Sequence, residues 1–257
     1  METGIFDTHA HYDDKQFDED RQQVIESLKD VICNVVNVGA SLEGCKRSVE
    51  LANEYPFFYA AVGVHPSDCG EMTKEDLDWI ESVLSYEKVV AVGEIGLDYY
   101  WDDVPRDIQK KWFVSQLEVA AKHNMPVIIH SRDAAADTFE IIREYKERIN
   151  KMVIHCFSYE KEMAKQYVDM GYYIGIGGVL TFKNARKLCE VARIVPIERI
   201  LLETDCPYLA PEPNRGTRNN SSNLVYVAKK LAEIKEMDVQ DVISITAANA
   251  RQFYNVV

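Results

Sequence analysis

The chain has 257 residues, of which 47% are hydrophobic and 28% are charged, the composition of an ordinary globular protein. This length fits two small domains or one large α/β barrel, and it is sufficient to bury a core without disulfides or metal ions. The formal net charge of −13 argues against broad, non-specific binding of nucleic acid, although bound divalent cations could reverse the field at a single site.

Membrane association and export are not expected from the sequence. No apolar run approaches the roughly 18 residues that a membrane span needs, and the N-terminus lacks the basic and apolar regions of a signal peptide. The six cysteines are scattered, with no C-x-x-C pair. These features predict a cytoplasmic protein with reduced thiols.

Short runs of β-branched and apolar residues alternate with longer polar stretches that have helical periodicity. Their average spacing of about 32 residues is that of the βα units of an eightfold barrel. Their continuous apolar character suits parallel strands that are covered on both sides. The sequence therefore predicts an α/β fold, a (β/α)8 TIM barrel forming a single domain over residues 1–257. A doubly wound open sheet would alternate similarly, so the prediction depends on the strand count. The eight candidate strands are 4–11, 31–39, 57–65, 89–98, 125–131, 152–158, 172–178 and 199–207.

Three of the intervening stretches carry clear helical signals. In 105–124, apolar residues recur every three to five positions, and Pro105 stands near the start. A second helix is expected over 222–237, with Ser222 as its N-cap, and a final helix over 239–254.

Titratable side chains gather at the ends of the candidate strands. Five of the six histidines lie there, with His123 as the exception, together with one glutamate and one aspartate. The C-terminal ends of barrel strands form the rim on which active sites are built, so we expect these side chains to converge. In chain order they are His9, His11, His65, Glu94, His130, His155 and Asp205.

The residue types in this set predict a metal site. Residues i and i+2 of a strand point to the same side, so His9 and His11 can reach one ion. Imidazole and carboxylate groups suit zinc, manganese and similar divalent ions. Four histidines with Glu94 and Asp205 exceed the needs of one tetrahedral zinc, which indicates two metals that share a carboxylate. Individually, each residue also has a structural interpretation, such as a hydrogen-bonded histidine or a helix cap, but one geometry explains all six.

Two further features have structural interpretations. The glycine-rich segment 175–180 lacks the third glycine of a dinucleotide-binding motif and is interpreted as a close-packed strand end. Cys156 and Cys206 each neighbour a candidate ligand. Because neighbours on a strand face opposite sides, we expect both thiols to point away from the metals and to pack between the barrel and its helices.

Seven motifs occur in the order seen in TatD-type metal-dependent deoxyribonucleases of the amidohydrolase superfamily, and the chain resembles this family from Phe6 to the closing "TAANARQFY". The most specific are "GEIGLDY" and "ETDCPYLAP". One segment departs from the family pattern. Many members carry R-G-K-R-N-E-P after the eighth strand, whereas 215–223 reads "RGTRNNSSN", so substrate contacts or loop stiffness can differ there. The other motifs are "DTHAHYD", "VGVHPSD", "MPVIIHSRDA", "VIHCFSY" and "YIGIGG".

The resemblance implies a (β/α)8 barrel that holds two divalent metal ions, of zinc, manganese or magnesium. Glu94 would bridge the ions, and Asp205 would bind the first ion and take the proton of the attacking water. His65 would contact the scissile phosphate. Arg132 is a second candidate phosphate contact, because its guanidinium matches phosphate oxygens. The implied ligands are His9, His11 and Asp205 for the first metal, His130 and His155 for the second, and Glu94 for both.

The resemblance also implies a hydrolase of phosphodiester bonds, a 3′–5′ exodeoxyribonuclease on single-stranded DNA, with RNA as another nucleic-acid substrate. Tyr99, Tyr100 and Trp101 would either stack on bases or form a hydrophobic lid or partner contact. A same-fold hydrolase of another bond, such as a D-aminoacyl-tRNA deacylase or a hydrolase of small amides, lactones or esters, is an alternative. A non-catalytic metal-binding scaffold is a further one.

Overall fold

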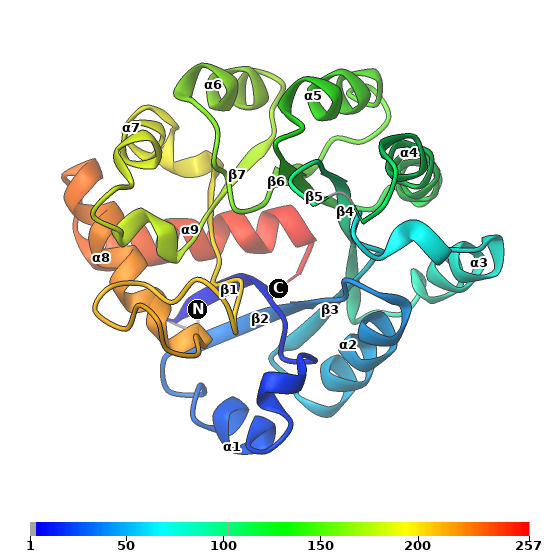
Figure 1. Cartoon of the computed structure of the whole chain (residues 1–257). Helices are drawn as coiled ribbons and strands as arrows, with labels where there is room; N and C mark the ends of the chain where they lie inside the picture. Colours follow the sequence, from blue (N-terminus) through cyan, green and yellow to red (C-terminus); the bar gives the residue numbers. More distant parts are fainter. Residues whose placement is uncertain (1–3, 102, 257) are drawn as a thin grey trace. The chain divides into compact units, whose positions relative to one another are not determined.

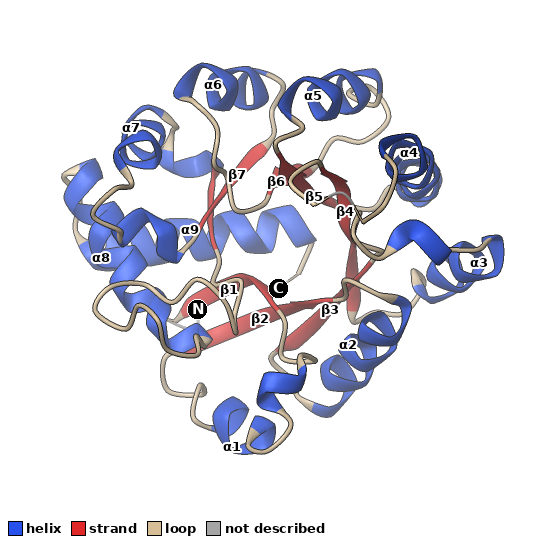
Figure 2. Ribbon diagram, viewed as in Figure 1, coloured by secondary structure: helices blue, strands red, loops and turns tan. Residues whose placement is uncertain are grey.

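The computed structural model describes residues 4–101 and 103–256, and it divides the chain into two compact units. Unit 1 comprises 1–37 and 156–257, and unit 2 comprises 38–155. Within each unit, strands alternate with helices along the chain (Figure 1, Figure 2). Among the described residues, no helix combines the length and the apolar character that crossing a membrane requires.

The strands of unit 2 pair in parallel with their neighbours in sequence. They are β3 (Phe58–Val62), β4 (Val89–Asp98), β5 (Val127–Arg132) and β6 (Met152–Ile154). The helices of this unit are α2 (Leu42–Glu54), α3 (Lys74–Val83), α4 (Arg106–His123), α5 (Ala135–Glu144) and the 3₁₀-helix η2 (Cys69–Glu71). Every residue of β4 is buried, as expected for a parallel strand that is covered on both faces.

In unit 1, β1 pairs in parallel with β2, and β7 pairs in parallel with β8. A bridge between Ala10 and Cys206 joins the end of β1 to the segment after β8. The strands are β1 (Ile5–Ala10), β2 (Ile32–Val38), β7 (Tyr173–Ile176) and β8 (Ile200–Leu202). The helices are α1 (Arg21–Glu26), α6 (Lys161–Asp169), α7 (Arg186–Ile194), α8 (Leu224–Lys235), α9 (Val239–Tyr254), η1 (Lys15–Phe17), η3 (Gly178–Thr181), η4 (Ile197–Arg199) and η5 (Ser221–Asn223).

The C-terminal helix α9 closes the core of unit 1 against β1 and β8. Phe253 packs edge-on against Tyr173, with ring centroids 5.3 Å apart. The hydroxyl of the buried Tyr254 donates a hydrogen bond of 2.8 Å to the carbonyl oxygen of Thr8. The end of the chain therefore holds the strand that carries His9.

All eight predicted strands are present, most of them shorter than predicted. The sixth and eighth end early, at Ile154 and Leu202, because the chain turns soon afterwards. Cys156 and Asp205 have left-handed backbone conformations, with φ of 44° and 58°, that a strand does not contain.

The three predicted helices are confirmed as α4, α8 and α9, and the bounds of α9 match the prediction. The prediction that Ser222 caps α8 is wrong. Asn223 occupies the N-cap position, and Ser222 lies in η5, where its backbone N–H donates to the side chain of Asn220. The polar run before α8 therefore forms a separate turn of 3₁₀-helix.

Candidate metal centre

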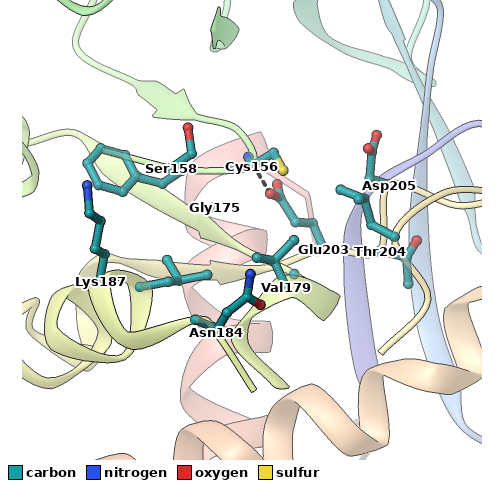
Figure 3. A pocket seen from close by; sticks show the side chains of 14 residues that line it. Cys156, Ser158, Gly175, Val179, Asn184, Lys187, Glu203, Thr204 and Asp205 are labelled. Atoms are coloured by element: carbon teal, nitrogen blue, oxygen red, sulfur yellow. Dashed lines mark hydrogen bonds between the residues drawn. The ribbon is translucent and has the colours of Figure 1, made fainter. Parts of the chain in front are cut away.

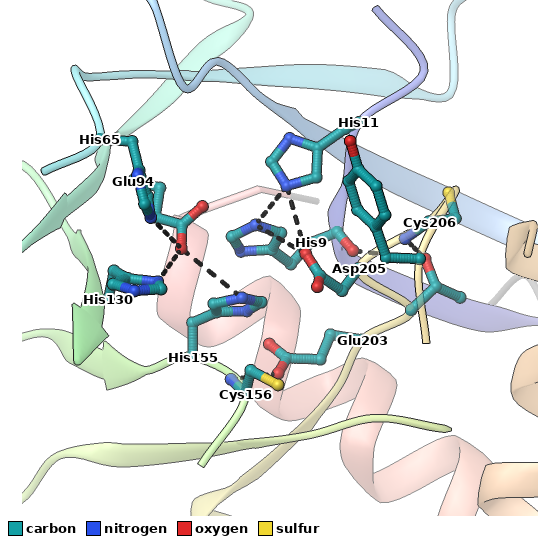
Figure 4. Close-up of polar contacts among 12 residues, drawn as sticks. His9, His11, His65, Glu94, His130, His155, Cys156, Glu203, Asp205 and Cys206 are labelled. Atoms are coloured by element: carbon teal, nitrogen blue, oxygen red, sulfur yellow. Dashed lines mark hydrogen bonds and ion pairs between the residues drawn. The ribbon is translucent and has the colours of Figure 1, made fainter. Parts of the chain in front are cut away.

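The first cluster, which we call the β1/β8 cluster, consists of His9, His11 and Asp205 in unit 1 (Figure 4). The Nε2 atoms of the two histidines lie 3.0 Å apart. The Asp205 Oδ1 atom lies 3.3 Å from the Nε2 atom of His11 and 3.8 Å from that of His9. Both histidines are buried, whereas Asp205 is partly exposed. Three potential ligand atoms thus converge on one point that solvent can reach.

Backbone hydrogen bonds between the two chain segments set this geometry. The Asp205 N–H donates to the His9 carbonyl oxygen at 2.9 Å, and the His11 N–H donates to the Cys206 carbonyl oxygen at 2.8 Å. The left-handed conformation of Asp205 turns the chain out of the strand direction three residues after β8 ends. The carboxylate is therefore held beside the two imidazoles by main-chain contacts.

Behind the β1/β8 cluster, the buried carboxylate of Asp7 connects three segments of unit 1. It accepts hydrogen bonds from the Thr204 N–H at 3.0 Å, the Thr204 hydroxyl at 2.6 Å and the Ser221 hydroxyl at 2.6 Å. Burial raises the pKa of Asp7 from 3.8 to about 6, and the hydrogen bonds oppose this shift. Asp7 thus fixes the residue that precedes Asp205.

The second cluster, which we call the β4/β5 cluster, lies in unit 2 and is centred on the buried side chain of Glu94 (Figure 4). The Glu94 Oε1 atom lies 2.7 Å from the Nδ1 atom of His130. The same oxygen lies 3.6 Å from the His155 Nε2 atom and 4.0 Å from the His65 Nε2 atom. One carboxylate oxygen therefore faces nitrogen atoms of three imidazoles.

The other ring nitrogen of His130, Nε2, lies 3.0 Å from the Oδ2 atom of the buried Asp98. Burial disfavours charge on His130, but its contacts with Asp98 and Glu94 outweigh this and raise its pKa above the usual value. Burial alone would raise the pKa of Asp98, yet the contact with His130 lowers it. A histidine between two carboxylates is typical of a metal ligand whose second nitrogen is oriented by an acidic group.

Each unit contains three side chains that fit a divalent metal ion, and in unit 2 these are His65, Asp98 and His130. The ligand atoms of His9, His11 and Asp205 all lie within 4.8 Å of one another. In this cluster, two imidazole Nε2 atoms face each other beside a carboxylate oxygen. A cation bound by these three atoms would give each of them a partner. Nitrogen and oxygen ligands of this kind suit zinc and manganese, and carboxylates also suit magnesium.

Within each unit, the side chains predicted at the strand ends lie together. They are His9, His11 and Asp205 in unit 1, and His65, Glu94, His130 and His155 in unit 2. Arg132 lies apart from these contacts, on an aromatic surface of unit 2. Its guanidinium carbon lies 3.8 Å from the ring centroid of Tyr100 and 5.8 Å from that of Trp101.

Besides Asp7, two buried carboxylates of the described residues were not among the predicted site residues. Asp98 contacts His130, and the Oε1 atom of Glu203 accepts a hydrogen bond of 2.6 Å from the backbone N–H of Cys156. The sequence signal that identified the other site residues, a position at the end of a strand, also applies to Asp98 and Glu203. Asp98 is the last residue of β4, and Glu203 follows β8 directly.

The prediction for Cys206 is confirmed and that for Cys156 is wrong. Cys206 is fully buried. Cys156 is partly exposed and lines a cavity together with Asp205. Because β6 ends two residues earlier and Cys156 has a left-handed backbone, the alternation of strand side chains does not extend to it.

The βα alternation and the histidine–carboxylate clusters at strand ends define the class of metal-dependent hydrolases with a (β/α)8 fold. Similar proteins belong to the same class. The uncharacterized metal-dependent hydrolase YabD of Bacillus subtilis (strain 168) is 45% identical over 98% of this chain and 99% of that protein. The uncharacterized metal-dependent hydrolase YcfH of Escherichia coli (strain K12) is 34% identical over 98% of this chain and 96% of that protein.

The chain belongs to the family described as TatD related DNase, whose family model matches residues 6–255. The crystal structure of YjjV, a TatD homologue from Escherichia coli K12, is similar with a TM-score of 0.91 and 29% identity, covering 98% of each chain. This likeness confirms the predicted (β/α)8 fold.

Proposed function

We propose that this metal-dependent hydrolase cleaves phosphodiester bonds as a 3′–5′ exonuclease on single-stranded DNA in the cytoplasm. The observation that carries the proposal is the pair of histidine–carboxylate clusters in a chain of the TatD related DNase family. Two divalent ions are the usual means of hydrolysing phosphate esters, because they stabilise both the attacking and the leaving oxygen.

Each cluster would hold one ion in this proposal. His9, His11 and Asp205 would bind the first, and His130 and His155 would bind the second. Glu94 would be shared between the ions, which is consistent with its short contact with the Nδ1 atom of His130. When bound, divalent ions lower the pKa of a coordinated water and offset negative charge on the phosphoryl oxygens.

The remaining chemistry belongs to side chains of this protein. Asp205 would accept the proton of the attacking water, because its carboxylate is the part of the β1/β8 cluster that is open to solvent. His65, at the edge of the β4/β5 cluster, would donate a hydrogen bond to a phosphoryl oxygen. Arg132 would bind a phosphate of the strand through its guanidinium.

The aromatic surface beside Arg132 supports a single-stranded substrate. Tyr100 and Trp101 expose 53% and 51% of their surface, and their rings meet edge to face with centroids 4.8 Å apart. Exposed rings beside a cation bind the unpaired bases of a single strand by stacking. Tyr99 is less suited to this role, because its side chain is only partly exposed and its hydroxyl donates to Asp137 at 2.6 Å.

The experiment is a cleavage assay with single-stranded DNA, duplex DNA and RNA, each labelled at its 5′ end, in the presence of magnesium, manganese or zinc. We expect stepwise shortening of single-stranded DNA from the 3′ end. Asp205→Ala should slow it by about 10²- to 10⁴-fold, the usual contribution of a general base, and Glu94→Ala should also inactivate the enzyme. The matched control is Asp169→Ala, which alters an exposed aspartate at the end of α6. Wild-type rates in purified Asp205→Ala would overturn the proposal.

A further inference from the structure

A cavity of about 200 Å³ opens beside Asp205 within unit 1 (Figure 3). Four segments line it: the turn after β6, the glycine-rich end of β7 with η3, the start of α7, and the segment after β8. Among its lining residues, Asp205 belongs to the β1/β8 cluster, and Glu203 and Cys156 are further possible metal ligands. None of the other lining residues is a predicted metal ligand. The cavity therefore adjoins the proposed hydrolytic site at Asp205 and extends beyond it.

Glycines keep the floor of the cavity open. A Cβ atom on Gly175 would lie 2.5 Å from the Oε2 atom of Glu203, and one on Gly177 would lie 3.0 Å from the Glu203 carbonyl oxygen. The Glu203 carboxylate is itself fixed by the backbone N–H of Cys156. Side chains at these glycines would collide with Glu203, so the sequence preserves a buried acceptor at the base of the cavity.

The walls combine apolar side chains with a few polar groups at the rim. Val179, Leu188 and Leu209 are among the apolar lining residues. Asn184 and Lys187 lie at the exposed edge, and the Nζ atom of Lys187 pairs with the Oε1 atom of Glu160 at 2.5 Å. The Asn184 amide forms no hydrogen bond within the described part of the chain, so its donor and acceptor remain available to a ligand.

We propose that this cavity binds the nucleobase of the 3′-terminal nucleotide while its phosphodiester lies at Asp205. A volume of about 200 Å³ is below the range of about 300–1,000 Å³ typical of sites for drug-sized ligands, so it suits one heterocycle and not a base pair. Apolar walls favour the faces of a planar ring. An asparagine amide pairs with base edges through its donor and its acceptor.

This inference rests on the proposed nuclease function and deepens it. A base can enter the cavity only when it is neither paired nor stacked, and extruding it costs least at a single-stranded end. The cavity would thus select an unpaired terminus, and the enzyme would release one nucleoside 5′-monophosphate for each bond cleaved.

The test compares two ligands that differ only in the base, deoxyadenosine 5′-monophosphate and 2-deoxyribose 5-phosphate. Their affinities are measured by calorimetry on the manganese-loaded protein. We expect the nucleotide to bind at least tenfold more tightly to the wild type. Asn184→Trp, which fills the mouth of the cavity from an exposed position, should abolish this difference, and Asn184→Ala should reduce it. The matched control, Lys183→Ala, alters the exposed neighbouring residue and should leave the difference unchanged.

Equal affinity of the wild type for the two ligands would overturn the inference, as would a preference for the nucleotide that survives in Asn184→Trp. The outcome can be separated from that of the nuclease proposal. If the protein shortens DNA but binds the two ligands equally, the base site is refuted and the nuclease function stands. If it prefers the nucleotide but cleaves no nucleic acid, the base site stands and the nuclease proposal fails.

Discussion

Two buried carboxylates, Asp98 and Asp7, lie behind the candidate metal ligands without belonging to the predicted ligand set. Asp98 contacts the outer nitrogen of His130, and Asp7 holds the turn that precedes Asp205. We expect both to orient the candidate ligands, because side chains bind a metal well only when their orientation is fixed.

Replacing Asp98 tests this orienting role. We expect Asp98→Asn to weaken metal binding by about 10- to 100-fold, the usual cost of losing a carboxylate behind a ligating histidine. The folded structure should persist, because the amide retains the shape of the side chain. Metal titration followed by calorimetry gives the affinity. The control is Asp107→Asn on the exposed face of α4, and equal affinities in the two variants would refute the role.

The raised pKa of Asp7 predicts a pH dependence of stability. Between its ordinary pKa of 3.8 and its folded-state value of about 6, the folded protein binds the proton more tightly than the unfolded chain does. The contribution of Asp7 to the free energy of unfolding is therefore largest below this window and declines as the pH rises through about 6. Over the pH range between these two pKa values, the free energy of unfolding contributed by Asp7 declines by about 3 kcal/mol.

Urea denaturation of the wild type and Asp7→Asn at several pH values measures this decline. Because asparagine does not titrate, we expect the wild type to lose stability relative to the variant as the pH increases from about 4 to 6. A constant difference between the two proteins across this range would show that the pKa of Asp7 is not raised.

At the scale of elements, the approach of β4 to β5 explains the sequence "GEIGLD". Gly96 pairs with His130 across the two strands. Its φ of 150° lies in a region that favours glycine, and a Cβ atom there would lie 1.9 Å from the His130 carbonyl oxygen. The strand can therefore place Glu94 and Asp98 on either side of His130 only with glycine at this position.

We expect Gly96→Ala to destabilise the fold by about 1–3 kcal/mol or more, as overpacking of a core does. It should also weaken metal binding to the β4/β5 cluster, because β5 must move away from β4. Thermal unfolding and metal titration measure the two effects. Gly70→Ala is the milder comparison, since its Cβ atom would meet only the Val104 side chain, at 3.3 Å. Similar losses in both variants would contradict the prediction.

For the whole molecule, we expect bound cations to stabilise the fold, because the net charge is −13 and several carboxylates are buried. Any ligand that binds only the folded state stabilises it, by about 2.7 kcal/mol at roughly 100 times its dissociation constant. For a protein of this size, that corresponds to an increase in Tm of about 5–10 °C.

We therefore expect chelation to lower the Tm and added manganese or zinc to restore it. Scanning calorimetry measures the shift. The control is the double variant His11→Ala with His130→Ala, which lacks one imidazole from each cluster and should show a much smaller response. A full response in this variant would mean that the ions act elsewhere.

The order and type of the elements could be predicted from the sequence alone. Because hydrophobic periodicity is a local property of the sequence, β4, α4 and α9 were predicted at or near their observed bounds. The sequence also indicates which side chains lie at the strand ends, because the position of a residue along a parallel strand places it at one edge of the sheet.

The contacts among these residues within each unit, and the residues that support them, could not be predicted from the sequence. The turns at Cys156 and Asp205 use left-handed backbone conformations at residues other than glycine, which no periodicity signals. The contact of Asp98 with His130 and the glycine-floored cavity beside Glu203 depend on distances between segments far apart in the chain. Such distances are set by tertiary packing, so they cannot be predicted from the pattern of residues along the sequence.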